Sequence, residues 1–402
     1  MREESQGAIP VKYQNFLLVS VILLLVGVSI TIVQYKIPSI LDLVMAQFAM
    51  DSATGAWLMS IFTAMGIFLS LPVGGLTKKL GPKRVLLLGC ATIVAGSIVG
   101  ALAGSAWLMI LSRGVEGIAF VFITVAGHLA VEKYVDAEHQ GTANGIWSLW
   151  ICLGSVIGST ATPMVFQSLG LAGTWLAYAV IVVACAVLLA VAVRVPEGLA
   201  EAAAEEGGEP VRLADYMQLL RPNALLYLFA YLVFNVEILA VLSYTPTFLQ
   251  QQGWDASLSG FASSLPGLLA VMAAVVFGRL IDKAGRTKAF YVVAMAAAAP
   301  ATFLMLTQSG PLLWAGALLM GLVGYGIPVA ALTSLPQIAG RKEMVPAMMG
   351  LFMMVQGLGE FLGCLVTPMI LGPALDQWML CGAMILALGV LGTAAIAVCR
   401  FK

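Results

Sequence analysis

Apolar runs long enough to cross a bilayer recur along the whole 402-residue chain. Sixty-one per cent of its residues are hydrophobic and 10% are charged, whereas about a quarter of the residues of a soluble domain are charged. A run of about 20 apolar residues spans the hydrocarbon core of a membrane. We count twelve, at 16–40, 55–76, 85–104, 106–131, 145–166, 173–194, 223–249, 257–281, 289–307, 311–338, 346–371 and 377–399. The sequence therefore predicts an all-α integral membrane protein with twelve transmembrane helices.

The two halves of the chain carry the same loop at the same place. GGLTKKLGPKR (74–84) follows the second run, and GRLIDKAGRTK (278–288) follows the eighth run, 204 residues later. At an offset of 205, Gly145 matches Gly350, and a Thr-Pro-Met sequence follows each of these glycines at the same distance. Two registers that agree to within one residue indicate an internal duplication. We expect two six-helix bundles related by a parallel repeat, 1–194 and 223–402, joined by an acidic cytoplasmic linker at 195–222.

Basic residues collect on one side of the predicted helices. Of the twenty Lys and Arg residues, only Lys36 and Arg113 lie away from that side. The positive-inside rule therefore places both termini in the cytoplasm, and we expect a bacterial cytoplasmic membrane protein. The polar N-terminal stretch has no cleavage site after the first run, which is typical of a retained anchor. All six cysteines lie within or at the ends of runs, so we expect buried, inert thiols and no disulfide framework.

The motifs of common enzyme classes are absent from the sequence. There is no phosphate-binding GxxxxGK[ST], no HExxH, and no GxSxG with a plausible triad. Two histidines are too few for a histidine metal site, so we expect neither metal nor cofactor. The zero net charge gives no argument for a nucleic-acid partner. Movement of a small solute across the bilayer, by a protein that is not an enzyme, is the remaining interpretation, and we expect a monomer.

Several motifs together resemble those of one transporter family. The repeated loop, the sequence Arg113-xx-Glu116-Gly117 and the segment TIVQYKIP (31–38) followed by Trp57 resemble the major facilitator superfamily. The resemblance covers the whole chain and implies two bundles that rock about a central site to give alternating access. The flank GIWSLW (145–150) is similar to cyanate- and metabolite-permease members.

The resemblance assigns the loop residues to a cytoplasmic gate. Lys78 stands where the family has an Asp, whereas Asp282 keeps that residue, so we expect the two halves to contribute unequally to closure. The predicted gating residues are Gly74, Lys78, Gly81, Arg84, Gly278, Asp282, Gly285 and Arg286.

Small residues are spaced four apart in several of the runs. The fifth run has Gly154-xxx-Gly158-Ser159 where a drug-antiporter motif has Gly-Pro, which argues against drug efflux. The eleventh run has the matching pair Gly359 and Gly363. Such spacing allows close helix packing. Static packing within a bundle and a moving interface between the halves are both open interpretations.

Charges inside the bilayer are the candidate functional groups, because each is costly there unless paired or wetted. Arg113 and Glu116 are three residues apart and share a helix face. At a rise of 1.5 Å per residue, Glu237 and Glu360 each lie about 20 Å from the cytoplasmic start of their runs, near the midplane. Lys36 lies near the outer end of the first run, where snorkelling to the interface is an alternative role.

These residues suggest a proton-coupled transporter of a small organic or inorganic anion. Burial favours the neutral form of a carboxyl group, so we expect the carboxyls to take up and release protons or to serve another coupling ion. The predicted substrate-binding residues are Arg113, Lys36, Gln34, Asn235 and Tyr231, and the predicted proton-coupling residues are Glu116, Glu237 and Glu360. Trp147, Trp150, Met353 and Met354 supply either apolar walls or core packing. A structural Arg113–Glu116 ion pair, drug efflux and a non-transporting solute sensor are the alternatives.

Overall fold

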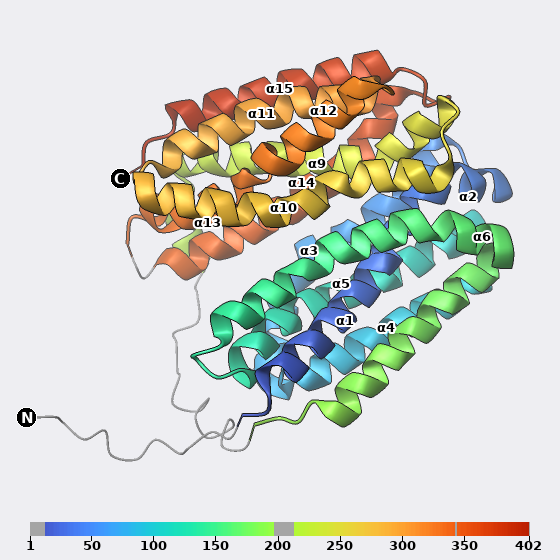
Figure 1. The fold of residues 1–402 in the computed structure, drawn as a ribbon, viewed down its shortest axis with the longest axis horizontal. Helices are drawn as coiled ribbons and strands as arrows, with labels where there is room; N and C mark the ends of the chain where they lie inside the picture. The colour runs from blue at the N-terminus through green and yellow to red at the C-terminus, as the bar shows by residue number, and fades with distance from the viewer. Residues whose placement is uncertain (1–12, 197–212, 342–343, 402) are drawn as a thin grey trace, which may run out of the picture.

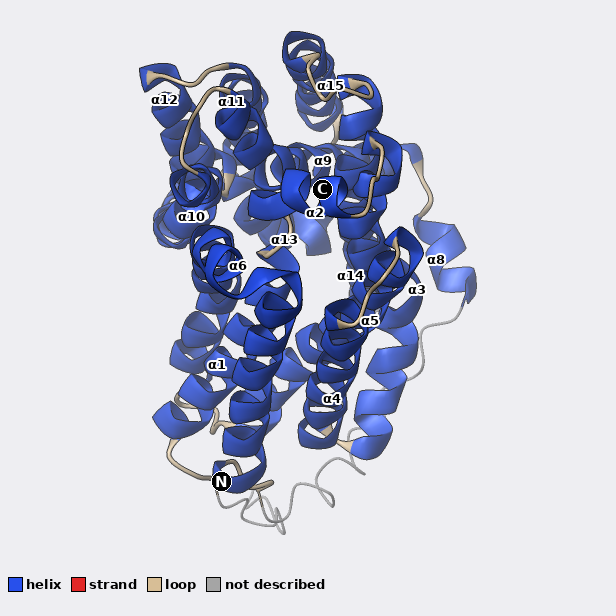
Figure 2. Cartoon of the chain, turned by 90° about the vertical axis from the view of Figure 1, so that its right-hand side faces the viewer, coloured by secondary structure: helices blue, strands red, loops and turns tan. Residues whose placement is uncertain are grey.

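The structure, a computed structural model, describes residues 13–196, 213–341 and 344–401, and these residues form helices and connecting loops without a strand (Figure 2). Most of the helices are long and apolar, and the short ones are η1, α2, α8, α12 and η2. The elements are α1 (Phe16–Tyr35), η1 (Pro38–Ile40), α2 (Leu41–Gln47), α3 (Ser52–Leu80), α4 (Pro82–Ala101), α5 (Ala106–Tyr134), α6 (Gln140–Ala192), α8 (Leu213–Leu219), α9 (Pro222–Gln251), α10 (Ala256–Ala284), α11 (Thr287–Thr307), α12 (Pro311–Leu319), η2 (Met320–Gly324), α13 (Gly326–Ala339), α14 (Val345–Leu371) and α15 (Trp378–Val398).

Helices α1 to α6 form one bundle and α9 to α15 form a second (Figure 1). Eleven described segments are long and apolar enough to cross a membrane. One of them, α6, has 53 residues and would be about 80 Å long if straight, far more than a bilayer requires. It turns back at Gly170, which has a φ of 66°. Because α6 thus holds the fifth and sixth predicted spans, the helices account for twelve crossings.

The repeated loop ends a helix in both halves, and its glycines have the backbone conformation that requires glycine. Gly81 ends α3 with a φ of 84°, and Gly285 ends α10 with a φ of 61°. Each donates its N–H to the carbonyl four residues before it, on Thr77 and Ile281. The match between these two glycines in the sequence therefore reflects a helix that ends at the same place in each half, although ψ is 151° at Gly81 and 18° at Gly285.

The paired glycines of the fifth and eleventh runs pack inside their own bundles. A Cβ at Gly154 would lie 2.9 Å from the carbonyl oxygen of Val28 on α1, and one at Gly359 would lie 2.6 Å from that of Leu232 on α9. Gly158 and Gly363 face the next turn of the same two helices. The interpretation of these glycines as a moving interface between the halves is therefore wrong, because their partners belong to the same bundle.

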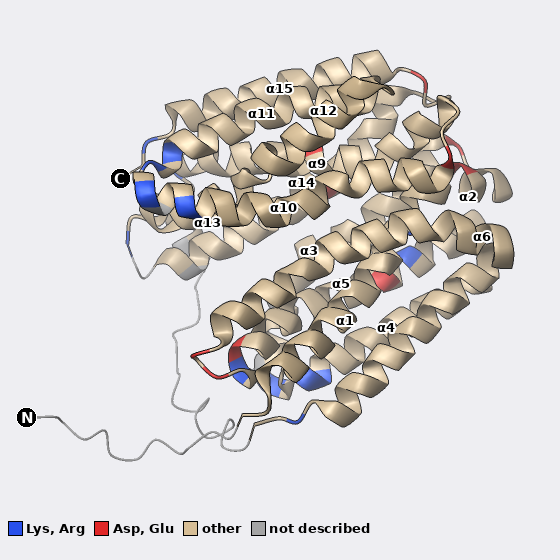
Figure 3. Cartoon of the chain, in the orientation of Figure 1, with Lys and Arg blue, Asp and Glu red and all other residues tan. Residues whose placement is uncertain are grey.

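The two bundles meet along α3 with α14 and along α6 with α10, away from the basic loops. A Cβ on Gly260 of α10 would clash with the backbone of Ser159 on α6, and Gln250 donates a hydrogen bond of 3.1 Å to the carbonyl of Ser39. The described Lys and Arg residues, except Lys36 and Arg113, lie at the other end, where the bundles diverge (Figures 1 and 3). We call this the basic end.

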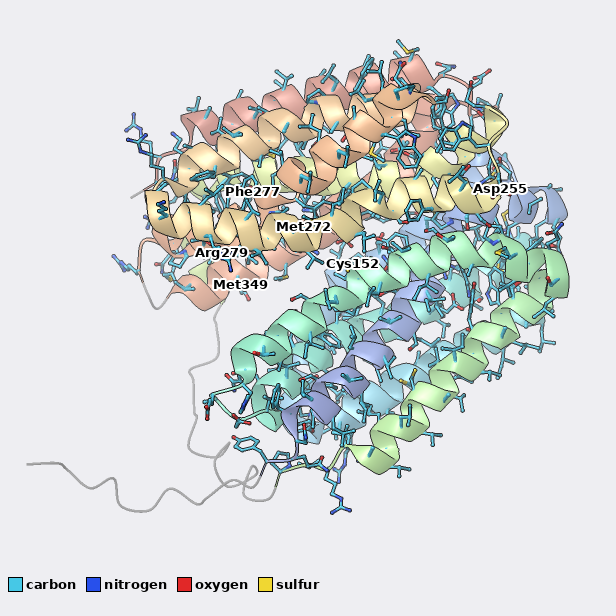
Figure 4. The ribbon with its side chains drawn as sticks, in the orientation of Figure 1. Cys152, Asp255, Met272, Phe277, Arg279 and Met349 are labelled. Atoms are coloured by element: carbon cyan, nitrogen blue, oxygen red, sulfur yellow. The ribbon has the colours of Figure 1, made fainter. Side chains whose placement is uncertain are left out.

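Apolar side chains of the facing helices are exposed toward the basic end. Phe68 on α3 is 70% exposed, and Met353 and Met354 on α14 are each 45% exposed. Figure 4 shows Cys152 of α6 and Met272 of α10 on either side of the line along which the bundles face each other. The bundles are thus in contact at the end opposite the basic loops and diverge toward the basic end.

Candidate functional site

An ion cluster is buried in the N-terminal bundle, with the Glu116 carboxylate at its centre. Lys36 Nζ lies 2.7 Å from Glu116 Oε1, and Arg113 Nη1 lies 2.5 Å from Glu116 Oε2. The Ser97 hydroxyl donates to Oε1 at 2.9 Å. The three charged side chains are 0–1% exposed. The cluster therefore joins α4 and α5 to Lys36, the residue that follows α1.

The Arg113 guanidinium is held mainly by backbone carbonyls. It donates to the carbonyl oxygens of Leu58 at 3.0 Å, Val33 at 2.9 Å and Gln34 at 3.1 Å, besides Glu116. The Phe62 ring lies 4.6 Å from its central carbon. A guanidinium has five N–H donors, so one is left over. Arg113 thus ties α5 to α1 and α3 and keeps one donor for another acceptor.

The sequence prediction of an Arg113–Glu116 pair agrees with the geometry, and Lys36 joins it from the end of α1. Lys36 does not reach an interface: its side chain is fully buried and its ammonium lies 4.0 Å from the centre of the Trp175 ring. With all three groups ionised, two cations face one carboxylate. Among the described residues, no second carboxylate pairs with them. The cluster therefore carries one uncompensated positive charge.

A small pocket lies beside this cluster, between the two bundles. The space in it that a water-sized sphere can reach is only about 10 Å³, enough for about one water molecule and far below the range of about 300–1,000 Å³ typical of ligand sites. Both bundles contribute to it, and its lining is partly polar. The lining residues are Gln34, Tyr35, Pro38, Met59, Phe62, Thr63, Arg113, Leu239, Ser243 and Cys364. Predicted residues Gln34 and Arg113 thus meet at one pocket, near the end where the bundles are in contact.

A hydrogen-bonded chain runs through the C-terminal bundle from α9 to α14. The Tyr231 hydroxyl donates to the Gln356 side chain at 3.0 Å, and the Gln356 amide donates to Glu360 at 3.0 Å. The Tyr231 ring stacks on Phe352 at 3.8 Å between centroids. Asn235 is turned inward, since its amide donates to the carbonyl of Tyr231. Glu360, which is partly exposed, is therefore connected to Tyr231 through Gln356.

The remaining predicted carboxyl, Glu237, stands apart from both groups. It is 0% exposed, and neither of its oxygens has a hydrogen-bond partner in the described part of the chain. Its side chain points toward Gly389 of α15 and Ala299 of α11. The structure therefore separates Glu237 from the pocket, whereas Glu360 and Glu116 belong to groups near the space between the bundles.

Sequence reasoning missed Tyr325, which follows the π-helical turn η2 in the tenth crossing. Turns of this type interrupt a helix and are frequent at functional sites. The Tyr325 ring meets Phe234 edge-on, and its hydroxyl would lie 3.7 Å from a Cβ placed on Gly267 of α10. The run of glycines around Tyr325, in MGLVGYGIP, was the signal in the sequence that the helix is interrupted here.

The predicted apolar walls divide into core and surface. Trp147 and Trp150 are 1% and 4% exposed and stack on each other at 5.4 Å, so they pack in the core of the N-terminal bundle. The Trp147 indole donates to His128 at 2.8 Å. Met353 and Met354, by contrast, are exposed toward the basic end.

The predicted gating residues lie at the basic end of both bundles. Gly74 and Gly278 lie within α3 and α10, and Arg84 and Arg286 are exposed. Lys83, which the gating prediction left out, donates to the carbonyls of Ala190 at 2.8 Å and Val193 at 2.6 Å and so caps the end of α6. The side chains of Lys78 and Asp282 lie outside the described ones, and their unequal contribution to closure stays a prediction.

One group of potential metal ligands lies in the loop between α5 and α6. Asp136, Glu138 and His139 have ligand atoms within 4.8 Å of one another. His139 Nδ1 lies 2.7 Å from Asp136, and this hydrogen bond lowers the pKa of the Asp136 carboxyl. The His139 ring stacks on Phe16 at 4.0 Å, so the pair holds the loop against the start of α1.

Comparison with known proteins finds relatives of this chain among transporters. In curated proteins, the chain is 27% identical over 168 residues to the galactose-proton symporter of Escherichia coli and 26% identical over 205 residues to its arabinose-proton symporter. It is 26% identical over 137 residues to the multidrug efflux pump LfrA of Mycolicibacterium smegmatis. These matches cover 42%, 50% and 34% of this chain but only 35%, 41% and 26% of the relatives.

The fold has a close counterpart among solved structures. A mutant of the nucleoside transporter NupG superimposes with a TM-score of 0.76 over 94% of this chain and 99% of that chain, at 13% sequence identity. Residues 18–364 match the Major Facilitator Superfamily. That match covers far more than half of the 402 residues. The chain therefore belongs to the Major Facilitator Superfamily and is a multi-pass membrane protein.

Proposed function

We propose that the protein is a proton-coupled secondary transporter of a small organic or inorganic anion. Its basic end faces the cytoplasm, as the positive-inside rule requires. The described conformation is then open toward the cytoplasm and closed toward the outside. Alternating access exposes the pocket between the bundles first to one side and then to the other.

The observation that carries this proposal is the charge of the buried cluster beside the pocket. Lys36, Arg113 and Glu116 together carry one excess positive charge, and Arg113 reaches the pocket wall with one unassigned N–H. An unpaired charge in a dry interior is costly. A bound anion lowers that cost, so the cluster favours an anionic solute over a neutral or cationic one.

The carboxyls near the space between the bundles supply the coupling. Protonation of Glu116 would raise the positive charge of the cluster by one and attract the anion more strongly. Glu360, linked to Tyr231 through Gln356, gives a second protonatable group on the facing bundle. Proton binding and anion binding then assist each other, which is the thermodynamic requirement for symport.

The relatives support proton coupling and suggest two rival cargoes. Two of the relatives are proton symporters whose names give a sugar, galactose or arabinose, as the solute. The hydroxyl groups of Tyr35, Thr63 and Ser243 in the pocket lining would also suit an uncharged sugar. The match to LfrA and the exposed Met353 and Met354 favour a second candidate, efflux of hydrophobic or cationic drugs. Both rivals differ from the proposal in the charge of the solute.

A ligand screen on the purified protein distinguishes these cargoes. Small mono- and dicarboxylates, inorganic anions, neutral sugars and cationic drugs are each added while thermal unfolding is followed, because a ligand that prefers the folded state raises the apparent melting temperature. Anions alone are expected to stabilise the wild type. Stabilisation by sugars or drugs and not by anions would overturn the proposal.

Counterflow of the stabilising anion in proteoliposomes then tests movement, which a non-transporting sensor would lack. Lys36→Met removes the excess positive charge and leaves the Arg113–Glu116 pair intact. It is expected to fold and to lose anion affinity. The control is Lys79→Met, which removes an exposed basic residue far from the pocket. Equal affinity of the two variants would contradict the role given to the cluster.

A further inference from the structure

Among the described residues, Glu237 is the one buried carboxyl that neither the ion cluster nor the pocket uses. It lies 15 residues after the first residue of α9, about 22 Å along the helix and hence near the middle of the membrane. The side chain is fully buried, and both oxygens lack a hydrogen-bond partner among the described residues. A buried polar group without a partner is rare, and its cost calls for a compensating gain.

The surroundings of Glu237 form a tight seam between α9, α11 and α15. A Cβ added to Gly389 of α15 would collide with Glu237 Oε1 and would lie near Ala299 of α11. One turn away, a Cβ on Gly392 would lie 3.0 Å from Val233 of α9 and 2.7 Å from Met295 of α11. Small residues thus bring the three helices close together around the carboxyl.

No charged side chain of the described part of the chain faces Glu237. Helix α15 contains no charged residue, and the one on α11, Lys288, lies 11 residues before Ala299, about 16 Å away along the axis. The titratable groups on these two helices are Tyr291, Cys381 and Lys288. On α9, the hydroxyls of Tyr231 and Tyr244 donate hydrogen bonds to partners on α14. The Tyr227 hydroxyl donates to the carbonyl of Ala331 on α13. Glu360 of α14 belongs to the chain with Gln356.

Helix α9 presents two opposite faces, and Glu237 lies on the one away from α14. Asn235 precedes Glu237 by two residues, about 200° around the helix. The Asn235 face contacts Gly359 of α14, and Tyr231 reaches Gln356 there. The same rigid helix therefore connects the Glu237 seam to the chain that ends at Glu360.

We propose that Glu237 is a further proton-binding site, outside the solute pathway, which is occupied when the seam between α9, α11 and α15 is closed. Uptake forms one O–H bond on the carboxyl with a proton from water, and release returns that proton to water. No other reactant is involved. An ionised, unpaired carboxylate in this seam would cost several kcal/mol, so proton loss opens the seam and proton uptake closes it.

Through this site, proton binding changes the position of α9, and the position of α9 in turn changes the solute site. Opening of the seam displaces α9 and with it Tyr231, whose hydroxyl holds Gln356 and, through it, Glu360. The inference rests on the proposed proton coupling for its purpose. Its test uses no solute, so failure of the anion assignment and failure of this site are separate results.

Infrared titration tests proton binding directly. The carbonyl stretch of a protonated carboxyl without hydrogen bonds differs from that of a hydrated one, and it responds slowly to deuterium exchange. Wild type, Glu237→Gln and the matched Glu360→Gln are compared in detergent across the pH range. The non-hydrogen-bonded band is expected in wild type and Glu360→Gln and absent in Glu237→Gln. A spectrum of Glu237→Gln that equals the wild type overturns the proposal.

Cysteine labelling tests the link to α9 and α14. Met353→Cys, on the exposed face of α14 in a cysteine-free background, is labelled with a water-soluble maleimide at acid and alkaline pH. After correction for the reagent's own pH dependence with a free thiol, its rate is expected to change by about tenfold. Adding Glu237→Gln is expected to fix the rate at its acid value. The same pH response with and without Glu237→Gln contradicts the proposal, and unchanged melting temperature shows that the variant folds.

Discussion

Replacing Glu116 by Gln gives the sharpest test of the ion cluster, because it changes charge and nearly nothing else. The substitution keeps the size of the side chain and leaves Lys36 and Arg113 buried, 0% and 1% exposed, without their shared carboxylate. Removal of one partner from a buried ion pair costs about 3–5 kcal/mol. Two cations share this one carboxylate, so we expect a loss at the upper end of that range.

The count of charges predicts a rescue. With Lys36 and Arg113 protonated and Glu116 ionised, the cluster has a charge of +1 in the wild type and +2 in Glu116→Gln. Lys36→Met on top of Glu116→Gln returns it to +1. The double variant should therefore recover most of the lost stability, although it has lost two charged groups. A purely steric account of the cluster predicts the reverse, because each substitution would add its own damage.

The six cysteines provide the assay, because all are free and buried. A fluorogenic thiol reagent reports their exposure as the detergent-purified protein is heated. A loss of 3–5 kcal/mol in a bundle of this size corresponds to a drop on the order of 10 °C. Glu138→Gln, which changes an exposed carboxyl in a loop, serves as the control. The charge argument is refuted if Glu116→Gln melts with the wild type or if Lys36→Met fails to restore it.

Three further outcomes follow from individual contacts. Lys83→Met removes two hydrogen bonds to the end of α6 and should lower the melting temperature by the equivalent of about 1–3 kcal/mol, whereas Lys79→Met, an exposed change, should not. Gln356→Leu cuts the connection between Tyr231 and Glu360, and it should abolish uptake driven by a pH gradient while counterflow persists; loss of both, or of neither, would contradict that connection. Gly260→Val forces α10 from the backbone of Ser159, so a cysteine at the buried position Ser39 should react faster with an impermeant reagent added outside. Gly141→Val, a glycine with open space around it, should leave that rate unchanged.

Features that depend on neighbouring residues were predictable from the sequence. The Arg113–Glu116 pair follows from a spacing of three on a helix. The loop glycines Gly81 and Gly285 follow from the repeat and from the backbone that a helix end requires. The twelve spans follow from hydropathy alone. In each case the physical cause lies within a few residues of the feature.

Features that depend on distant residues were not predictable. Lys36 joins Glu116 across 80 residues of sequence, and no local pattern distinguishes that partnership from snorkelling. Glu237 and Glu360 have the same depth and chemistry in the sequence. Only the packing of α9 and α14 turns one toward a dry seam and places the other beside Gln356. Direction around a helix, rather than depth, decides the role of a membrane carboxyl.

The duplication explains why packing was easier to predict than chemistry. Gly154 meets Val28 in the first bundle, and 205 and 204 residues later Gly359 meets Leu232 in the second, so the close contact between helices was copied with the chain. The charges were not copied: the stretch 317–321 (ALLMG), which matches the region of Arg113 and Glu116, is uncharged, and Glu360 matches Ser155. A duplicated scaffold with one-sided charges separates two tasks that a symmetric protein would have to combine. Under the proposed function, Lys36 and Arg113 of the N-terminal bundle attract the anion, and Glu237 and Glu360 of the C-terminal bundle bind protons apart from these cations. Rocking of one bundle against the other then changes the distance between the two sets of charges.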